Sequence, residues 1–410
     1  MTKKILIFFI LAILAQAGYS FLVPTFGTSD CWKDLSALNN YKGHTYSSFD
    51  QDLVGKVYGL VGNYHVVCDA GGFVLLAHDF PADYFRGRTL FINRPLYPLL
   101  VNLAARPLHL IVNSYSMTFA AAILVNILLF FASCVLFYRL AEKYFSPKTA
   151  LISVILLIFS PFAHSWLVQP EGNILGLFSV VAALALLDDY VSRPTRARLM
   201  IYSLIVGVTF LVKMNIAISI FIFFLAVYGR KFKQGAVFFL LHLVPLALWY
   251  LVAAKWWGLA FGVQEVSKFG AGVWILALYK QPLYRAVGEL LAAVPNFFTA
   301  LFYGFLGLPV ILSLVGLYKA AENKFYILYG GLLGSFFVLM FALHFYLPRH
   351  AFLVFPLVYP LAVAGIETVA AAIGNESARK FFIAATYFLI IAPTFLDIFK
   401  LYEYLGVIYS

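Results

Sequence analysis

The chain has 410 residues, of which 63% are hydrophobic and 11% are charged, whereas about 25% of the residues in soluble proteins are charged. With a mean hydropathy of +0.90, the composition excludes a disordered chain and a soluble disulfide scaffold and indicates a membrane protein. The net charge of +11 fits basic cytoplasmic loops, and without a recognition motif it does not indicate a nucleic-acid partner.

Eleven apolar runs are long enough to be interpreted as transmembrane helices. They predict an all-α, polytopic membrane protein in which residues 1–410 form a single integral membrane domain. The predicted spans are 5–23, 116–137, 149–167, 173–188, 199–212, 214–228, 235–254, 297–318, 325–345, 351–370 and 381–399. The first run also resembles a signal peptide, and we interpret it as a retained helix.

Residues 199–228 allow two interpretations, either one long helix with Lys213 at mid-membrane or two short helices that meet near Lys213. With two helices, fifteen basic residues of the short loops fall on one side, and only Lys213 and Arg349 fall on the other. Cytoplasmic loops carry the excess of Lys and Arg in membrane proteins, so we favour two helices. This choice predicts a cytoplasmic N-terminus and an external C-terminus.

Two long loops are then external, on the periplasmic, extracellular or luminal side. The first, residues 24–115, contains seven of the 18 acidic residues. Within it, residues 49–62 have the spacing of an amphipathic helix, and residues 95–112 form an apolar stretch interrupted by two prolines that suits a helix on the membrane surface. The second loop, residues 255–296, mixes cations with Trp and Tyr, as interfacial segments do.

Several ionisable residues of these loops need an explanation, because charge near a bilayer is costly. Asp50 and Asp52 in Asp50-Gln51-Asp52 are either a catalytic or metal-binding pair or acids that stabilise a helix N-terminus. Glu171 lies in a very short external loop and is either functional or a solvated loop charge. Lys213 and the Arg349–His350 pair either clamp a phosphate or anchor the chain at the interface. Two carboxylate sites and two cationic sites thus lie on one predicted face.

These features resemble the GT-C superfamily of membrane glycosyltransferases, which use sugars carried on polyprenyl or dolichyl phosphate. In that pattern a first helix is followed by a long external loop with an Asp-x-Asp-like motif, here Asp50-Gln51-Asp52, and a further acid follows in the next external loop, here Glu171. Three more segments resemble the family, and they are Arg94-Pro95-Leu96-Tyr97-Pro98, residues 207–213 ending at Lys213, and residues 348–356 beginning Pro348-Arg349-His350. We expect the chain to lack the large external C-terminal domain of some members.

The resemblance implies transfer of a sugar from a polyprenyl (dolichyl) phosphate to a lipid, glycan or protein acceptor on the external face, with inversion at the anomeric carbon. Asp50 or Asp52 is expected to be the base, and Glu171 to orient the acceptor or share that role. We assign substrate binding to cations, with Lys213, Arg349 and His350 on the phosphate and Arg94 and Lys268 supporting them. No cofactor is required, and a divalent metal, Mg²⁺ or Mn²⁺, is compatible with the site.

The alternative from another functional class is a transporter or flippase for a lipid-linked or small polar substrate. Transporters place ionisable groups near the membrane midplane and often contain inverted repeats. In this chain the polar residues fall at one predicted surface and no repeat is visible. A non-catalytic membrane subunit is the third interpretation. Motifs for nucleotide binding and for zinc or serine proteolysis do not occur in the sequence.

Overall fold

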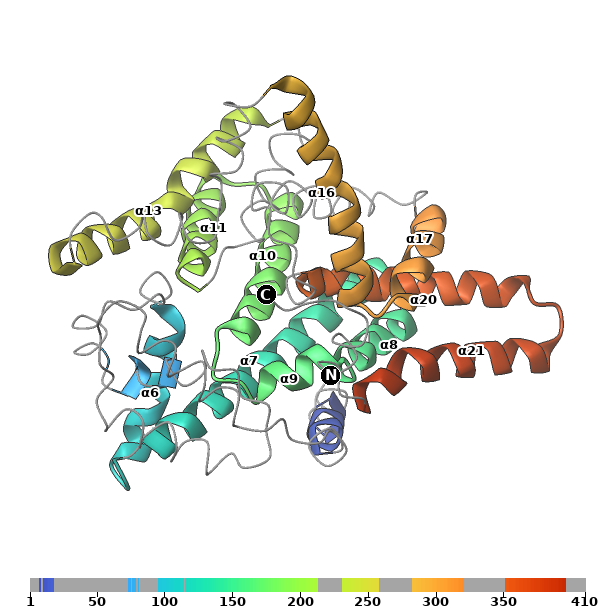
Figure 1. Ribbon diagram of the computed structural model, residues 1–410, viewed down its shortest axis with the longest axis horizontal. Helices are drawn as coiled ribbons and strands as arrows, with labels where there is room; N and C mark the ends of the chain where they lie inside the picture. The colour runs from blue at the N-terminus through green and yellow to red at the C-terminus, as the bar shows by residue number, and fades with distance from the viewer. Residues whose placement is uncertain are drawn as a thin grey trace.

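The computed structural model describes residues 7–8, 10–17, 73–74, 76–78, 80, 95–113, 115–212, 231–257, 282–320 and 351–395. All regular elements in this part of the chain are helical, which confirms the all-α class (Figure 1). Four of its helices are long and apolar enough to cross a membrane, or up to six spans if two bent pairs are counted. The total of eleven spans remains a prediction, since residues 214–228 and 325–345 lie outside the described residues, as does the expected helix at 49–62.

The described elements are α-helices and short 3₁₀ turns. In chain order they are α6 (Leu96–His109), α7 (Tyr115–Tyr144), α8 (Pro147–Ile158), α9 (Pro161–Leu167), α10 (Asn173–Ser192), α11 (Arg196–Val208), η1 (Thr209–Leu211), α13 (Phe232–Trp257), α16 (Leu283–Gly304), α17 (Leu308–Ala320), η3 (Phe352–Val354), α20 (Phe355–Ala372), α21 (Glu376–Ile391) and η4 (Ala392–Phe395). The side chains of Ser146, Thr195 and Asn375 accept hydrogen bonds from backbone N–H groups in the first turns of α8, α11 and α21. Such caps satisfy N–H groups that have no partner inside the helix.

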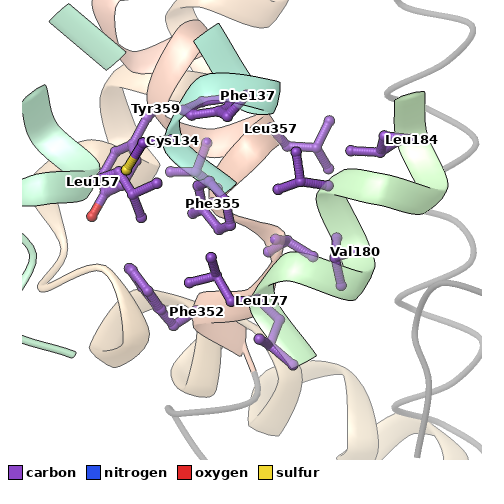
Figure 2. Packing of buried hydrophobic residues seen from close by; sticks show 14 of the residues in the cluster. Cys134, Phe137, Leu157, Leu177, Val180, Leu184, Phe352, Phe355, Leu357 and Tyr359 are labelled. Atoms are coloured by element: carbon purple, nitrogen blue, oxygen red, sulfur yellow. The ribbon is translucent and has the colours of Figure 1, made fainter. Parts of the chain in front are cut away.

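The largest apolar core lies where α7, α8, α10 and α20 meet (Figure 2). Figure 2 shows Phe137 of α7 beside Phe355 of α20, whose ring centroids are 5.0 Å apart. Leu157 of α8 and Leu177 of α10 belong to the same cluster. Lipid tails are as apolar as these side chains, so close packing stabilises such a core more than removal from water does.

Two helix crossings depend on glycine. Gly316 of α17 and Gly365 of α20 face each other, and a Cβ on either would overlap backbone atoms of the opposite helix, at Leu361 and Leu312 respectively. A Cβ on Gly207 of α11 would likewise overlap the backbone of His242 in α13. Small residues at these points let the helix backbones approach closely, as is common in membrane proteins.

Two predicted spans are broken rather than continuous, which corrects the sequence interpretation. The 149–167 span consists of α8 and α9, which are bent by 54°. Pro161 begins α9, and a proline disfavours helical backbone in the residue before it. The 297–318 span bends by 110° between α16 and α17, where Leu306 and Gly307 have φ angles of 55° and 80°. The helix α16 itself begins at Leu283, inside the segment 255–296 that was expected to be a loop.

Charged residues gather at one end of the bundle. Lys143 of α7 pairs with Asp188 of α10 at 2.8 Å, Arg198 of α11 pairs with Asp189 at 3.2 Å, and Lys148 of α8 lies 3.8 Å from Glu367 of α20. These pairs tie together the loops that are predicted to be cytoplasmic. The opposite end of α10, about 30 Å away for a 20-residue helix, begins at Asn173 and carries the site described next.

Candidate active site

The site is built on the turn between α9 and α10, which contains Glu171. Every residue from 160 to 177 is buried, and Glu171 is only 6% exposed. The interpretation of Glu171 as a solvated loop charge is therefore wrong. Burial of a carboxylate is costly unless it is hydrogen-bonded, so the fold keeps this residue inside at an energetic cost, which favours a functional role.

Hydrogen bonds within the turn fix the carboxylate. The side-chain amide of Asn173, the first residue of α10, donates to Oε2 of Glu171 at 2.7 Å. The backbone N–H of Glu171 donates to the carbonyl of Gln169 at 2.7 Å. The side chain of Gln169 in turn donates to the hydroxyl of Ser165 in α9, at 3.1 Å. The turn thus has a defined conformation in which Glu171 is held by its own neighbours.

A second set of hydrogen bonds ties the turn to α7. Asn126 is fully buried in that helix, and its amide nitrogen lies 2.7 Å from the carbonyl oxygen of Gln169 and 3.3 Å from those of Trp166 and Leu167. The last carbonyls of a helix have no partner within it. Asn126 therefore supplies the donor that the C-terminal end of α9 and the following turn need inside the protein.

Tyr97 connects the same network to α6. Its hydroxyl donates to Oδ1 of Asn126 at 3.0 Å, and the side chain is 1% exposed. Burial raises the pKa of the Tyr97 phenol well above its usual value, and the nearby charge of Glu171 raises this pKa further. The phenol consequently stays protonated and remains a hydrogen-bond donor beside the carboxylate.

Three chain segments that lead to predicted cationic residues meet this buried region. Tyr97, three residues after Arg94, is the first. Val212 is the second, since a Cβ on Gly172 would be 3.5 Å from Cγ1 of Val212 and 3.8 Å from the Cβ of Tyr97. Phe352 is the third, and its ring centroid lies 5.4 Å from those of Phe162 and Trp166 in α9.

The other predicted site residues lie outside the described residues, so the structure places Glu171 alone among them. They are Asp50, Asp52, Arg94, Lys213, Lys268, Arg349 and His350. In the part of the chain that is described, no three His, Cys, Asp or Glu side chains gather as a metal site would require. Glu171 supplies one oxygen-donating group of the kind that Mg²⁺ or Mn²⁺ prefers, and metal binding stays a prediction.

The sequence interpretation missed Tyr97, Asn126 and Asn173 as members of this region. Asn126 had a detectable signal, because it is a polar residue within an otherwise apolar run that spans the membrane. Asn173 is two residues from Glu171, but sequence spacing does not predict that its amide turns back to the carboxylate. Tyr97 lies in a segment that was noted for its family resemblance and as part of a predicted helix on the membrane surface, not as a site residue.

Part of the chain matches a known protein family. Residues 97–257 match the sequence model of the dolichyl-phosphate-mannose-protein mannosyltransferases, a family of the GT-C superfamily. The matched segment contains Tyr97, Asn126, Glu171, Asn173 and Lys213. The match confirms the resemblance to the GT-C superfamily, and the apolar helices indicate a multi-pass membrane protein.

Solved structures with a similar arrangement include the oligosaccharyltransferase of Archaeoglobus fulgidus. Its complex with Zn and sulfate matches with a TM-score of 0.46 and 19% identity, over 73% of this chain and 43% of that one. The same archaeal enzyme, AglB, in complex with an inhibitory peptide and a dolichol-phosphate matches with a TM-score of 0.41 and 15% identity, over 73% and 46%. The chain thus spans less than half the length of these proteins. No curated protein matches the sequence.

Proposed function

Given its resemblance to the GT-C superfamily, we propose that this chain transfers a sugar from a polyprenyl (dolichyl) phosphate to an acceptor at the external face of the membrane. The observation that carries the proposal is the buried turn at Glu171 inside the matched segment 97–257. A transporter remains the alternative, and no described feature favours it.

The position of the turn supports a role for the predicted cations. Val212 precedes Lys213, Tyr97 follows Arg94 by three residues, and Phe352 follows His350 by two. Each of the three described residues contacts the turn, α9 or Asn126. Adjacent Cα atoms are about 3.8 Å apart, so the chain enters or leaves the region of Glu171 within a few residues of Arg94, Lys213, Arg349 and His350.

The proposed reaction is an inverting displacement. A hydroxyl or amide of the acceptor attacks the anomeric carbon of the sugar, the bond between that carbon and the phosphate oxygen breaks, and the lipid phosphate leaves. A carboxylate, Asp50 or Asp52, takes the proton of the acceptor, and Glu171 orients the acceptor or shares this role. Lys213, Arg349 and His350, with Arg94 and Lys268, stabilise the negative charge of the leaving phosphate.

The donor and the acceptor are proposals drawn from the matches. The matched family is named for dolichyl-phosphate mannose and protein acceptors, so mannosyl phosphate on a polyprenyl or dolichyl chain is the first donor to test. One of the similar structures is tethered to an acceptor peptide, and a peptide is one acceptor class beside lipids and glycans.

The test is transfer of radiolabelled sugar by the purified protein in detergent, with a panel of polyprenyl-phosphate sugars and with peptide, lipid and glycan acceptors. Extraction of the purified protein and mass spectrometry would identify a copurified polyprenyl phosphate. We expect both a bound carrier and transfer of its sugar. If the protein, reconstituted in vesicles, moved an intact lipid-linked sugar from one leaflet of the membrane to the other without bond cleavage, the result would instead support a flippase.

A further inference from the structure

We infer that Asn126 and Tyr97 are positioning residues for Glu171, and that they act by fixing the turn 168–172 from the neighbouring helices α7 and α6. This inference rests on the proposed function, since it assigns a role within the same site. It goes beyond the family pattern, in which the acidic residue itself is the recognisable feature.

The turn buries backbone polar groups that have no partner within a helix. Residues 168–172 are non-helical backbone within a fully buried segment. Backbone N–H and C=O groups that are buried away from water need hydrogen-bond partners. Asn126 offers donors to the carbonyls of Trp166, Leu167 and Gln169, and so compensates this backbone from a different helix.

The orientation of Asn126 decides which end of its amide faces the turn. An asparagine amide can rotate by 180° and exchange its donor and acceptor ends. The hydroxyl of Tyr97 donates to Oδ1 of Asn126, which leaves the amide N–H groups directed to the turn. Because the carbonyls of Trp166, Leu167 and Gln169 can only accept, the amide nitrogen must face the turn. The Tyr97 hydroxyl stabilises this orientation by donating to Oδ1.

Gln169 links Asn126 to the residue that carries the carboxylate. Gln169 accepts a hydrogen bond from Asn126 and another from the backbone N–H of Glu171. Asn126 is thus two hydrogen bonds from the backbone of Glu171. Without the amide of Asn126, the carbonyl of Gln169 would lose the donor that comes from α7. The backbone of Glu171 would then no longer be connected to α7 through Gln169. Misplacement of a reacting group by about 1 Å can lower a rate by roughly 100-fold.

The matched control residues lie on the same helix. Ser133 is also fully buried in α7, and its hydroxyl donates a hydrogen bond to the carbonyl of Leu129, one turn earlier in the same helix. Tyr138 donates its hydroxyl to Glu142 in the predicted cytoplasmic half of α7. Ser133→Ala and Tyr138→Phe therefore remove similar polar groups away from the turn.

The experiment compares Asn126→Leu and Tyr97→Phe with these two controls, each in the wild-type and in the Glu171→Gln background. We expect kcat to fall roughly 100-fold for Asn126→Leu and roughly 10-fold for Tyr97→Phe, while KM for the polyprenyl-phosphate sugar changes less than about threefold. In the Glu171→Gln background, each change should lower kcat by less than about twofold further, because residues that act through one group are not additive. If the fall in kcat of a double variant equalled the product of the falls in the two single variants, the inference would be overturned.

A readout that does not depend on activity is hydrogen exchange of the peptide covering residues 168–174. Asn126→Leu and Tyr97→Phe should accelerate exchange there by about 10-fold or more, whereas Ser133→Ala should not. Unchanged exchange would overturn the inference, whatever the enzyme assay shows. If exchange accelerates but Glu171→Gln transfers sugar at the wild-type rate, the positioning of the turn stands and the role of Glu171 in the proposed reaction fails. Tyr97→Phe removes one oxygen atom and keeps the test valid if Asn126→Leu does not fold.

Discussion

The side-chain amide of Asn173 donates a hydrogen bond of 2.7 Å to Oε2 of Glu171, the residue two positions before it. Asn173→Ala removes this donor and leaves a buried carboxylate oxygen without it. Loss of a hydrogen bond to a buried charged group costs about 1.5–3 kcal/mol. We therefore expect a lower melting temperature in detergent together with reduced sugar transfer, measured by thermal unfolding and by the transfer assay. Equal stability of Asn173→Ala and the wild type would contradict the hydrogen bond.

The crossing of α17 and α20 leads to a prediction about stability alone. Gly316→Ala and Gly365→Ala would each place a methyl group into the backbone of the opposite helix. Overpacking of this kind costs about 1–3 kcal/mol, which thermal unfolding in detergent should detect. Gly288→Ala in α16 is the control, since a Cβ there meets nothing within 4 Å. If all three variants melted alike, the close crossing would be incorrect.

A similar change at the α11–α13 crossing should affect the site as well. Gly207→Ala forces α11 away from His242, and η1 carries this displacement toward Val212, which contacts Gly172. We expect reduced thermal stability and reduced sugar transfer by the folded fraction. Gly172→Ala is the comparison, because its Cβ would meet Val212 and Tyr97 at ordinary van der Waals distances, so it should retain activity. If Gly172→Ala lost activity while Gly207→Ala kept it, this prediction would be contradicted.

How far the sequence predicts the fold is shown by the predicted span 116–137, which the structure extends to α7, Tyr115–Tyr144. Hydropathy detects its apolar centre but misses the polar last turns, where Lys143 is bound by Asp188 from a distant part of the sequence. The two bends had local signals in Pro161 and in Gly307, which adopts a positive φ. A window that averages hydropathy cannot register either residue, because both lie within apolar stretches.

The candidate site, like the fold, was predicted from the sequence only in part. Glu171 could be selected from the sequence because charge in a short loop between spans is unusual. Its burial could not, because burial depends on α6, α7 and the end of α11, which come together only in the fold. The contact between Tyr97 and Asn126 joins residues 29 positions apart, and no periodic pattern encodes such a pair.

The topology predicts the accessibility of the loop before α21. Asn375 caps this helix by accepting a hydrogen bond from the backbone of Ala378, and Ser377 is exposed. We predict that this loop and the first turn of α21 are cytoplasmic, so a cysteine introduced in that turn as Ser377→Cys should not react with an impermeant maleimide in intact cells. It should react after permeabilisation. Labelling in intact cells would contradict the interpretation of residues 199–228 as two helices.

The predicted carboxylates and cations should separate kinetically. Asp50→Asn or Asp52→Asn keeps the shape but removes a proton acceptor, so the variant that lacks the base should lose about 10²–10⁴ in rate. Arg349→Ala should instead raise KM for the lipid-linked donor, because it weakens phosphate binding. Steady-state kinetics with varied donor concentration would distinguish these effects. Wild-type rates in both Asp variants and in the double variant would remove this motif as the source of the base.

The most direct test of the central claim is sugar transfer from a polyprenyl phosphate by the purified wild type and by Glu171→Gln at matched folded concentration. Gln has nearly the same shape as Glu but carries no charge and accepts no proton. We predict that the wild type releases the lipid phosphate and glycosylates an acceptor, and that Glu171→Gln binds the donor but transfers its sugar at least about 100-fold more slowly. Equal transfer rates for the two proteins would contradict the assignment of the buried Glu171 turn to the active site.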